Sequence, residues 1–181
     1  GAGVNPTLGG WAFIKSSGDV SITNSLGGSA VGRGLTVTTG GAVTVTGDND
    51  AAIKSKATIT AGRNVSIQNK SGIATLNNDA DITSRGAVSI TNTGSGLAVD
   101  GKLTVYNSGS VKVSGGNASA PAVSGDITLT STGKMELSNP KGQVTNKKLT
   151  VKNSTGEVSV TGNKSDGSAL VQGGASIDTT G

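Results

Sequence analysis

The carboxylates are the first residues to consider for chemistry, because the chain has no histidine and no cysteine. It therefore lacks an imidazole base, a thiolate nucleophile, a disulfide framework and the nitrogen and sulfur ligands of zinc and iron sites. Asp48 and Asp50 share one loop, and their hard oxygens could bind Ca²⁺. The loop lacks the Gly-Gly-x-Gly-x-Asp repeat of calcium-binding β-rolls, which favours a polar turn.

Catalysis by two carboxylates, as in glycoside hydrolysis, requires acidic residues that converge on one substrate. Asp79 and Asp81 flank a single apolar residue, and Arg33, Arg63 and Arg85 lie near bends between different strands. No convergent cluster of acids and arginines is therefore predicted. We expect no enzyme activity, no cofactor and no metal site.

Threonine pairs of the form T-x-T are a second candidate for function. Four of them are predicted on the outward side of strands: Thr36 and Thr38, Thr44 and Thr46, Thr58 and Thr60, and Thr128 and Thr130. Flat arrays of such pairs on β-helices are a feature of ice-binding proteins. Here Asp81, Tyr106, Lys152 and Asp178 interrupt the array, and threonine is itself a favoured strand residue. We therefore interpret the pairs as structural.

Composition limits the fold and the partners. Of 181 residues, 30 are glycine, 2% are aromatic and 14% are charged, whereas about 25% of residues are charged in an ordinary globular domain. The apolar residues are mostly small aliphatics, which predicts a thin core. The net charge of +4 is spread without a run of five like charges, so no nucleic-acid partner is expected. No apolar segment approaches the ~20 residues of a membrane span, so no membrane insertion is expected.

A repeat of about 23 residues runs through the chain. Its first series consists of a glycine, an apolar and polar alternation, and a final Asn or Gly. The leading apolar residues recur every 22 to 24 residues, at Val20, Val43, Val65, Val88, Val111, Met135 and Val158. This alternation predicts short strands with one buried face.

Two further series keep the same period. The second begins with Ala12, Leu35, Ala57, Ala80, Leu103, Ile127, Leu149 and Ala175. The third is shorter and comprises Leu8, Val31, Ile53, Leu76, Val99, Val123, Val144 and either Leu170 or Val171. Three strands per repeat predict an all-β parallel β-helix of about seven to eight coils, stacked ~4.8 Å apart.

Parallel crossovers favour a right-handed helix. A hairpin meander is the competing structure, but it would reverse direction at each turn and would not need one register over the whole chain. We assign residues 8–181 to a single β-helix domain, a fragment of a longer shaft. Residues 1–7 are expected to be an N-terminal extension or the remnant of a preceding coil.

The position four residues after each leading apolar residue is Asn or Gly in seven of seven repeats. These corner residues are Asn24, Gly47, Asn69, Asn92, Gly115, Asn139 and Gly162. Only Gly and Asn adopt a left-handed backbone at low cost, so we expect a bend with positive φ in every coil. Where Asn69 and Asn92 are neighbours in the stack, their amides could form a short ladder of hydrogen bonds.

Charged residues offer a check on the stacking. The residues just before the second-series strands alternate in sign over five coils, at Lys56, Asp79, Lys102, Asp126 and Lys148. In-register stacking would place each lysine between two aspartates. Exposed pairs of this kind are weak, but they disfavour a slip of one coil.

Three aromatic residues and one set of loops are the candidate interaction surfaces. Trp11 and Phe13 flank the inward-facing Ala12 and should point outward, where they would pack against a preceding coil, an N-terminal cap or another subunit unless a local segment covers them. Tyr106 is the third. The loops after the corner residues vary most between repeats, as recognition segments of repeat proteins do. They span residues 25–29, 48–50, 70–72, 93–96, 116–121, 140–142 and 163–168.

The G-x-V-x-I-x-N repeats, the Gly-Leu-Thr-Val-Thr and Lys-Leu-Thr-Val strands and the lack of Cys and His resemble the filamentous haemagglutinin family of bacterial exoproteins of two-partner secretion. The resemblance covers nearly all of residues 8–181. It implies a right-handed β-helical shaft, export through an outer-membrane transporter partner, and a secreted or cell-surface location. Secretion domains of this family carry an Asn-Pro-Asn type of motif. The segment Val4-Asn5-Pro6-Thr7 departs from that motif, so we expect a shaft fragment.

The resemblance also implies adhesion, or delivery of a C-terminal toxin. We therefore expect a non-catalytic adhesin shaft that presents loops to a host receptor or glycan, or to a neighbouring bacterial cell. Two alternatives stay open. One is the stalk of a contact-dependent toxin-delivery exoprotein, and the other is a carbohydrate-binding or carbohydrate-active β-helix with its ligand site along one face.

Overall fold

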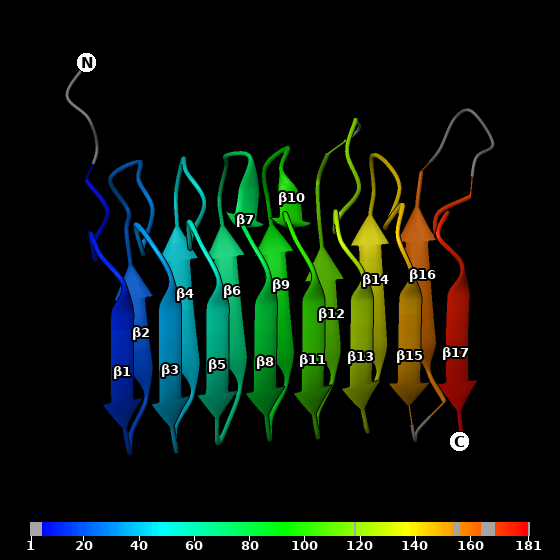
Figure 1. Cartoon of the computed structure of the whole chain (residues 1–181), viewed down its shortest axis with the longest axis horizontal. Helices are drawn as coiled ribbons and strands as arrows, with labels where there is room; N and C mark the ends of the chain where they lie inside the picture. Colours follow the sequence, from blue (N-terminus) through cyan, green and yellow to red (C-terminus); the bar gives the residue numbers. More distant parts are fainter. Residues whose placement is uncertain (1–4, 118, 154–155, 164–168, 181) are drawn as a thin grey trace.

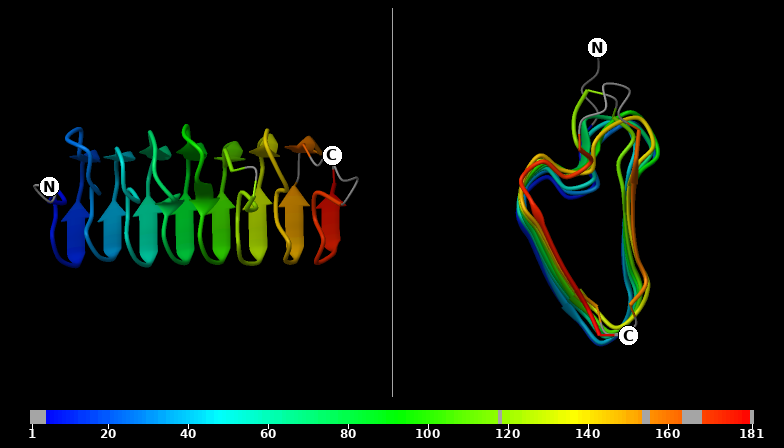
Figure 2. Two further views of the ribbon diagram at one scale, coloured as in Figure 1. Left: turned by 90° about the horizontal axis from the view of Figure 1, so that it is seen from above. Right: turned by 90° about the vertical axis from the view of Figure 1, so that its right-hand side faces the viewer.

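The computed structural model describes residues 5–117, 119–153, 156–163 and 169–180, which form seventeen β-strands and no helix. Nothing in these segments can therefore serve as a membrane-spanning helix. The strands lie side by side in chain order along a single stack (Figure 1). Viewed from the end, the coils superimpose on one elongated outline, with the loops gathered at one end of it (Figure 2).

Two long sheets and a short third sheet form the walls of the stack. The eight-stranded sheet contains β1 (Ala12–Ser16), β3 (Leu35–Thr39), β5 (Ala57–Ala61), β8 (Ala80–Ser84), β11 (Leu103–Asn107), β13 (Ile127–Ser131), β15 (Leu149–Asn153) and β17 (Ala175–Thr179). The seven-stranded sheet contains β2 (Val20–Thr23), β4 (Val43–Gly47), β6 (Val65–Asn69), β9 (Val88–Asn92), β12 (Val111–Ser114), β14 (Met135–Asn139) and β16 (Val158–Gly162). The third sheet pairs β7 (Ala74–Leu76) with β10 (Leu97–Val99).

The register of the stack is the one that the repeat predicts. The leading residue Val43 pairs with Val20 on one side and with Val65 on the other. In the second series, Leu35 pairs with Ala12 and with Ala57 in the same way. Every strand pairing in the described segments is parallel. This arrangement confirms a parallel β-solenoid with coils about 23 residues apart and rules out the hairpin meander.

The third side of each coil is the least regular. Outside β7 and β10 it is held by isolated parallel bridges, such as Val31 to Ile53 and Val99 to Val123. Near the C-terminal end the bridge joins Thr145 to Val171, one residue beyond the predicted Val144. Val144 is nevertheless fully buried. The third series therefore supplies core side chains in each coil, but regular strand pairing only in the middle of the stack.

The core is a narrow column of aliphatic side chains between these walls. Residues in equivalent positions stack on one another, so Val105, Leu129 and Val151 follow in consecutive coils of the eight-stranded sheet. Each is at most 1% exposed. Each coil can bury only a few side chains by itself, and stacking neighbours complete the core.

The prediction of a left-handed bend at every corner residue is wrong. Positive φ angles occur in the described residues only at Gly27, Gly72, Gly156 and Gly174, and none of these is a corner residue. Asn24, Gly47, Asn69, Asn92, Gly115, Asn139 and Gly162 instead end the first-series strands or directly follow them. The bend comes later, in the loop.

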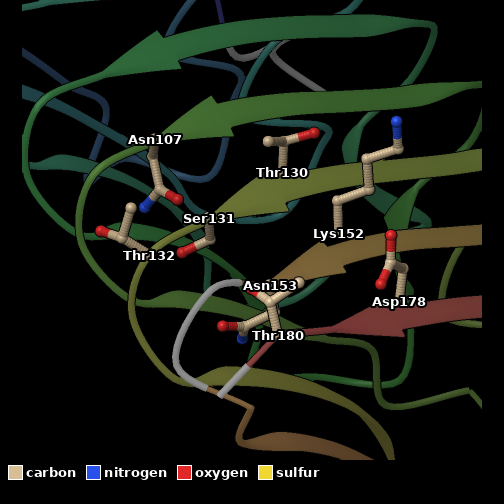
Figure 3. A pocket seen from close by; sticks show the side chains of 8 residues that line it. All are labelled: Asn107, Thr130, Ser131, Thr132, Lys152, Asn153, Asp178 and Thr180. Atoms are coloured by element: carbon tan, nitrogen blue, oxygen red, sulfur yellow. The ribbon is translucent and has the colours of Figure 1, made fainter.

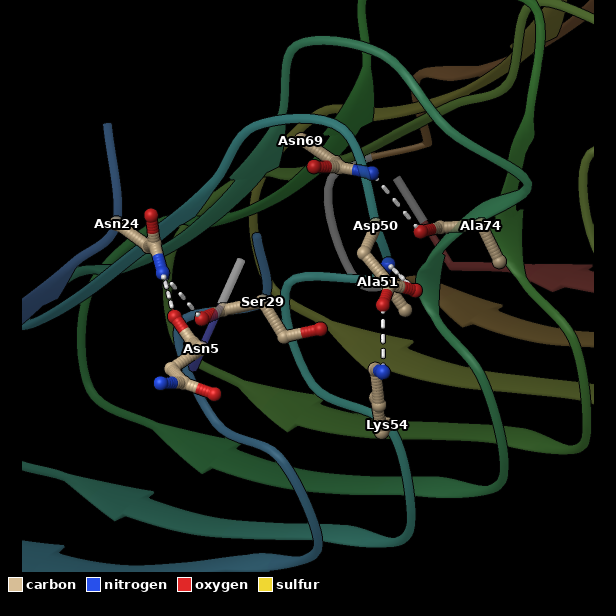
Figure 4. Close-up of polar contacts among 8 residues, drawn as sticks. All are labelled: Asn5, Asn24, Ser29, Asp50, Ala51, Lys54, Asn69 and Ala74. Carbon is tan, nitrogen blue, oxygen red and sulfur yellow. Dashed lines mark hydrogen bonds and ion pairs between the residues drawn. The ribbon is translucent and has the colours of Figure 1, made fainter. Parts of the chain in front are cut away.

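Asparagine occupies four of the corner positions, and its side-chain amide forms hydrogen bonds there. The Asn69 Nδ2 donates to the carbonyl of Ala74 at 3.1 Å, and the Asn24 Nδ2 donates to the carbonyl of Ser29 at 2.9 Å (Figure 4). The side chain thus ties the end of a strand to the segment that returns from the loop. Because a buried carbonyl needs a donor, this bond stabilises the closed loop.

Glycine occupies the other corner positions because there is no space for a side chain. A Cβ atom on Gly47 would lie 2.7 Å from the Cα atom of Ala52, and one on Gly115 would lie 2.8 Å from the Cα atom of Ala122. In these coils the returning segment packs directly against the strand end, and no side chain fits between them. The preference for Asn or Gly thus combines two different requirements, neither of which concerns φ.

The predicted ladder between Asn69 and Asn92 does not form. The Asn69 Oδ1 and the Asn92 Nδ2 are both buried without a hydrogen-bond partner. The Asn92 Oδ1 instead accepts hydrogen bonds from the backbone N–H groups of Gly94 and Gly96. Each amide therefore serves its own loop, and the neighbouring coil is not its partner.

Replacement of Asn139 by alanine is expected to lower the free energy of unfolding by about 2 kcal/mol, because it removes two hydrogen bonds that a buried side chain donates to backbone carbonyls. The Asn139 Nδ2 donates to the carbonyls of Gln143 at 2.8 Å and of Ala120 at 3.1 Å. Urea denaturation measures the change. The matched control is Asn77→Ala at an exposed bend, where we expect a change near zero. Equal losses in the two variants would contradict the role given to the corner amide.

The alternating charges stack as predicted, but they do not pair as predicted. The carboxylate of Asp79 accepts a hydrogen bond from the backbone N–H of Lys102 at 2.7 Å, and Asp126 does the same for Lys148 at 3.1 Å. Lys56 pairs with Asp81, at 2.9 Å, and this hydrogen bond raises the pKa of Lys56. These aspartates therefore join coils through the backbone, because the N–H group is closer to them than the mobile lysine head group.

Candidate interaction surface

The outer face of the eight-stranded sheet carries two rows of side chains, most of them polar, because the strands alternate inward and outward residues. The first row consists of Phe13, Thr36, Thr58, Asp81, Thr104, Thr128, Thr150 and Ser176. The second row consists of Lys15, Thr38, Thr60, Thr83, Tyr106, Thr130, Lys152 and Asp178. The register confirms that Asp81, Tyr106, Lys152 and Asp178 interrupt the threonine array.

The three aromatic residues all point away from the core, as predicted. Phe13 is 75% exposed, Trp11 is 52% exposed and Tyr106 is 51% exposed. Phe13 and Tyr106 stand on the outer face of the eight-stranded sheet, four strands apart in the order β1, β3, β5, β8 and β11. No described segment folds over them. They are therefore available for contacts outside the described part of the chain.

Trp11 lies over the next coil, at a place where that coil has no side chain. A Cβ atom on Gly34 would fall 1.9 Å from the Cζ3 atom of the Trp11 ring. Gly34 occupies the position equivalent to Trp11 one repeat later, so the ring fills the space that a side chain there would take. Packing against the next coil thus covers about half of the Trp11 side chain, whereas Phe13 is 75% exposed.

A hollow of about 300 Å³ opens on the outer face of the eight-stranded sheet, at the ends of β13, β15 and β17 (Figure 3). Its lining includes Asn107, Thr130, Thr132, Lys152, Asp178 and Thr180. Thr130, Lys152 and Asp178 belong to the second outward row, and Tyr106 is the register partner of Thr130. The aromatic ring therefore stands one strand away from the hollow, on the same face.

The hollow offers both donors and acceptors. Lys152 and Asp178 lie side by side on neighbouring strands, and no ion pair joins either of them to another described residue. The Thr132 Oγ1 donates to the carbonyl of Ser108 at 2.5 Å, which leaves its oxygen free to accept. The exposed groups of Thr132, Lys152 and Asp178 can therefore bind a polar ligand through hydrogen bonds.

The sequence reasoning missed this hollow. It recognised Tyr106, Lys152 and Asp178 only as interruptions of a threonine array. A signal was present, because the three share one row with Thr130 in four consecutive repeats. The depth of the hollow depends on the path of the following turn, and the strand pattern does not specify that path.

The variable loops form a separate surface at one end of the outline (Figure 2). Apolar side chains are exposed at two places on it, because Leu26 in the loop 25–29 is 82% exposed and Ile73, directly after the loop 70–72, is 77% exposed. Residues 118 and 164–168, which belong to the predicted variable loops, lie outside the described residues, as do residues 1–4 of the predicted N-terminal extension. The loop surface thus combines isolated apolar tips with polar backbone.

The candidate calcium loop contains an internal ion pair. Asp50 lies 2.5 Å from Lys54 and accepts a hydrogen bond from the backbone of Ala51 (Figure 4). Burial raises the pKa of the Asp50 carboxyl, but the hydrogen bonds from Lys54 and Ala51 outweigh that effect and lower it. Within the described segments, no three His, Cys, Asp or Glu residues come together as metal ligands would. The carboxylate of Asp50 is therefore engaged in holding its own loop.

Comparison with known proteins gives one family and no individual relative. No curated protein and no solved structure matches the chain. The sequence model of a family described as MspA matches residues 10–162, which include β1 to β16. That match spans most of the chain, and the chain therefore belongs to the MspA family.

Proposed function

We propose that this chain is a non-catalytic shaft segment of a large, secreted bacterial surface protein of the filamentous haemagglutinin type. The observation that carries the proposal is the unbroken register of the stack. All strands of the eight-stranded sheet, whose edge strands are β1 and β17, pair in parallel with their neighbours. In a solenoid each coil contacts only its neighbours. Length can therefore grow by repetition, which is the property that a shaft needs.

The loops supply the second half of the proposal. They leave the stack at one end of its cross-section, and their sequences differ between coils while the strands keep their pattern. Substitutions in such loops change the surface with little effect on the core. The shaft would hold these loops away from the cell, where they meet a host receptor or glycan, or a neighbouring bacterial cell.

Two parts of this proposal rest on the resemblance to the filamentous haemagglutinin family. The first is the location, at the bacterial cell surface or in the medium, and the second is the secretion partner, an outer-membrane transporter. The lack of cysteine supports the proposal, since a disulfide would obstruct a chain that crosses a pore unfolded. A toxin-delivery stalk would need the same shaft, and the sequence that follows in the parent reading frame distinguishes the two.

Attachment of coated beads to cells tests the proposal. Beads that carry the chain, beads that carry albumin and beads that carry the double variant Leu26→Ser and Ile73→Ser are applied to epithelial cells and to bacteria. We expect the chain to attach beads to at least one cell type above the albumin level, and the double variant to attach fewer, because it removes the two exposed apolar loop tips. Attachment at the albumin level to every cell type would contradict the proposal.

A carbohydrate-binding role is the second candidate, and a specific observation favours it. An exposed aromatic ring near a hollow that carries a few polar groups suits small polar ligands. Tyr106 and the hollow next to it have this form. The two candidates are compatible, because a shaft can carry a glycan site on its side.

A further inference from the structure

Binding sites for sugars combine two kinds of contact, because a sugar ring has apolar C–H faces and a rim of hydroxyl groups. An aromatic ring packs against the face, and donors and acceptors bind the rim. Tyr106 offers such a ring, since about half of its surface is exposed. The hollow beside it provides the hydroxyl, ammonium, carboxylate and amide groups.

The charges of the hollow indicate what kind of sugar would fit. One cation, Lys152, and one anion, Asp178, line it on neighbouring strands, so the charged groups balance. A balanced pair gives no net attraction for a sulfated or carboxylated glycan. Lys152 can donate to a hydroxyl group and Asp178 can accept from one, which suits an uncharged sugar.

The groups of this site stand on strands and not on loops. Tyr106, Thr130, Lys152 and Asp178 stand on four adjacent strands, each in register with the next. Side chains on strands are placed more firmly than side chains on loops, and a preformed site loses less entropy when a ligand binds. The spacing of the groups therefore follows from the stack itself.

We propose that the hollow near Tyr106 is a binding subsite for a short uncharged segment of a glycan, with the Tyr106 ring packed against the face of one sugar unit and Lys152 and Asp178 bound to hydroxyl groups of the next unit, in the hollow. The proposal rests on the surface-attachment function, for which it names a ligand class. It also separates two surfaces, since the variable loops lie at the other end of the outline.

Titration of the whole chain with defined oligosaccharides tests the proposal. The probes are neutral oligosaccharides of glucose, galactose, mannose and N-acetylglucosamine, with heparin as the anionic probe, and the readout is calorimetry. We expect saturable binding of at least one neutral probe and a loss of about tenfold in its affinity in Tyr106→Ala, as for one lost aromatic contact. Asp178→Ala should weaken the same probe, because it removes an acceptor in the hollow.

The control is Phe13→Ala, which removes an aromatic side chain from the same face but four strands away. It should bind the neutral probe as the unaltered chain does. Binding of heparin alone, binding of no probe, or equal affinity in Tyr106→Ala would overturn the proposal. An equal loss in Phe13→Ala would also overturn it, because binding would then follow exposed aromatic surface and not the hollow.

The outcome is distinct from that of the bead experiment. Beads that attach to cells equally well with and without Tyr106→Ala would leave the attachment function in place and remove the sugar subsite from it. Oligosaccharide binding without attachment to any cell would leave the sugar subsite in place and contradict the attachment function. Circular dichroism of each variant confirms that the strands are intact before binding is compared.

Discussion

Leu129→Ala is expected to lower the free energy of unfolding by about 3 kcal/mol, one of the two largest effects of a single substitution that we predict. Leu129 lies in β13 with no exposed surface and stacks between Val105 and Val151. Truncation removes apolar contacts on both sides and leaves a cavity. The walls cannot close on it, because hydrogen bonds fix the distance between strands at ~4.8 Å.

Chemical denaturation followed by circular dichroism measures the loss. The matched control is Thr128→Ala in the same strand, which points outward between Thr104 and Thr150. It should cost less than about 1 kcal/mol, the range of strand propensity. If the two variants lost similar stability, the inward and outward assignment of β13 would be wrong.

Gly133→Ala is expected to cost about 3 kcal/mol through the opposite mechanism, which is excess volume. A Cβ atom at this position would lie 2.6 Å from the carbonyl carbon of Gly109 in the preceding coil and 2.8 Å from the backbone nitrogen of Ser110. Both atoms belong to backbone, so no side chain can turn aside. The coils would have to move apart locally, and the hydrogen bond from Gly133 to Gly109 would lengthen.

The chain provides its own control for this substitution. Gly18 occupies the equivalent position in the first coil, and a Cβ atom there would meet nothing within 4 Å. Gly18→Ala should therefore leave the free energy of unfolding within about 0.5 kcal/mol of the unaltered chain. A large loss in Gly18→Ala, or none in Gly133→Ala, would show that contact between coils does not select glycine at this position.

The strand register was predictable from sequence because it depends on one property that residue types report directly. Inward positions need aliphatic side chains, outward positions tolerate Thr, Ser or Lys, and the 23-residue period aligns them. The repeat alone therefore pairs Val43 with Val65, and this pairing is confirmed. The third series was less certain because its strands are short. Its last bridge falls at Thr145 and not at Val144.

The corner residues show where residue type stops being informative. Asn and Gly share a tolerance for positive φ, and the prediction relied on that shared property. In the structure Asn69 is selected by the hydrogen bond that it donates, and Gly47 by the closeness of Ala52. Three physical requirements give the same two residue types, so the sequence pattern alone could not tell them apart.

The candidate site was predicted in part. The outward direction of Phe13 and Tyr106 follows from strand alternation, and both are exposed. The hollow near Tyr106 depends on the turn after β13, where Thr132 forms part of its lining, and the small residues of that turn fit many backbone paths. The contact between Trp11 and Gly34 depends on the exact overlap of equivalent positions in two coils, which residue types do not report.

Cross-linking of two introduced cysteines tests the in-register parallel stack most directly, and the natural lack of cysteine keeps the test free of competing thiols. Thr44 and Ser66 face outward on β4 and β6 and are register partners. Parallel neighbours lie ~4.8 Å apart, within the range that a disulfide spans, whereas a shift of two residues increases the separation to about 8 Å. The stack predicts rapid intramolecular oxidation of Thr44→Cys with Ser66→Cys, and little of Thr44→Cys with Gln68→Cys. Preferred cross-linking of the second pair, or of neither, would contradict the register on which the shaft and its sugar subsite both depend.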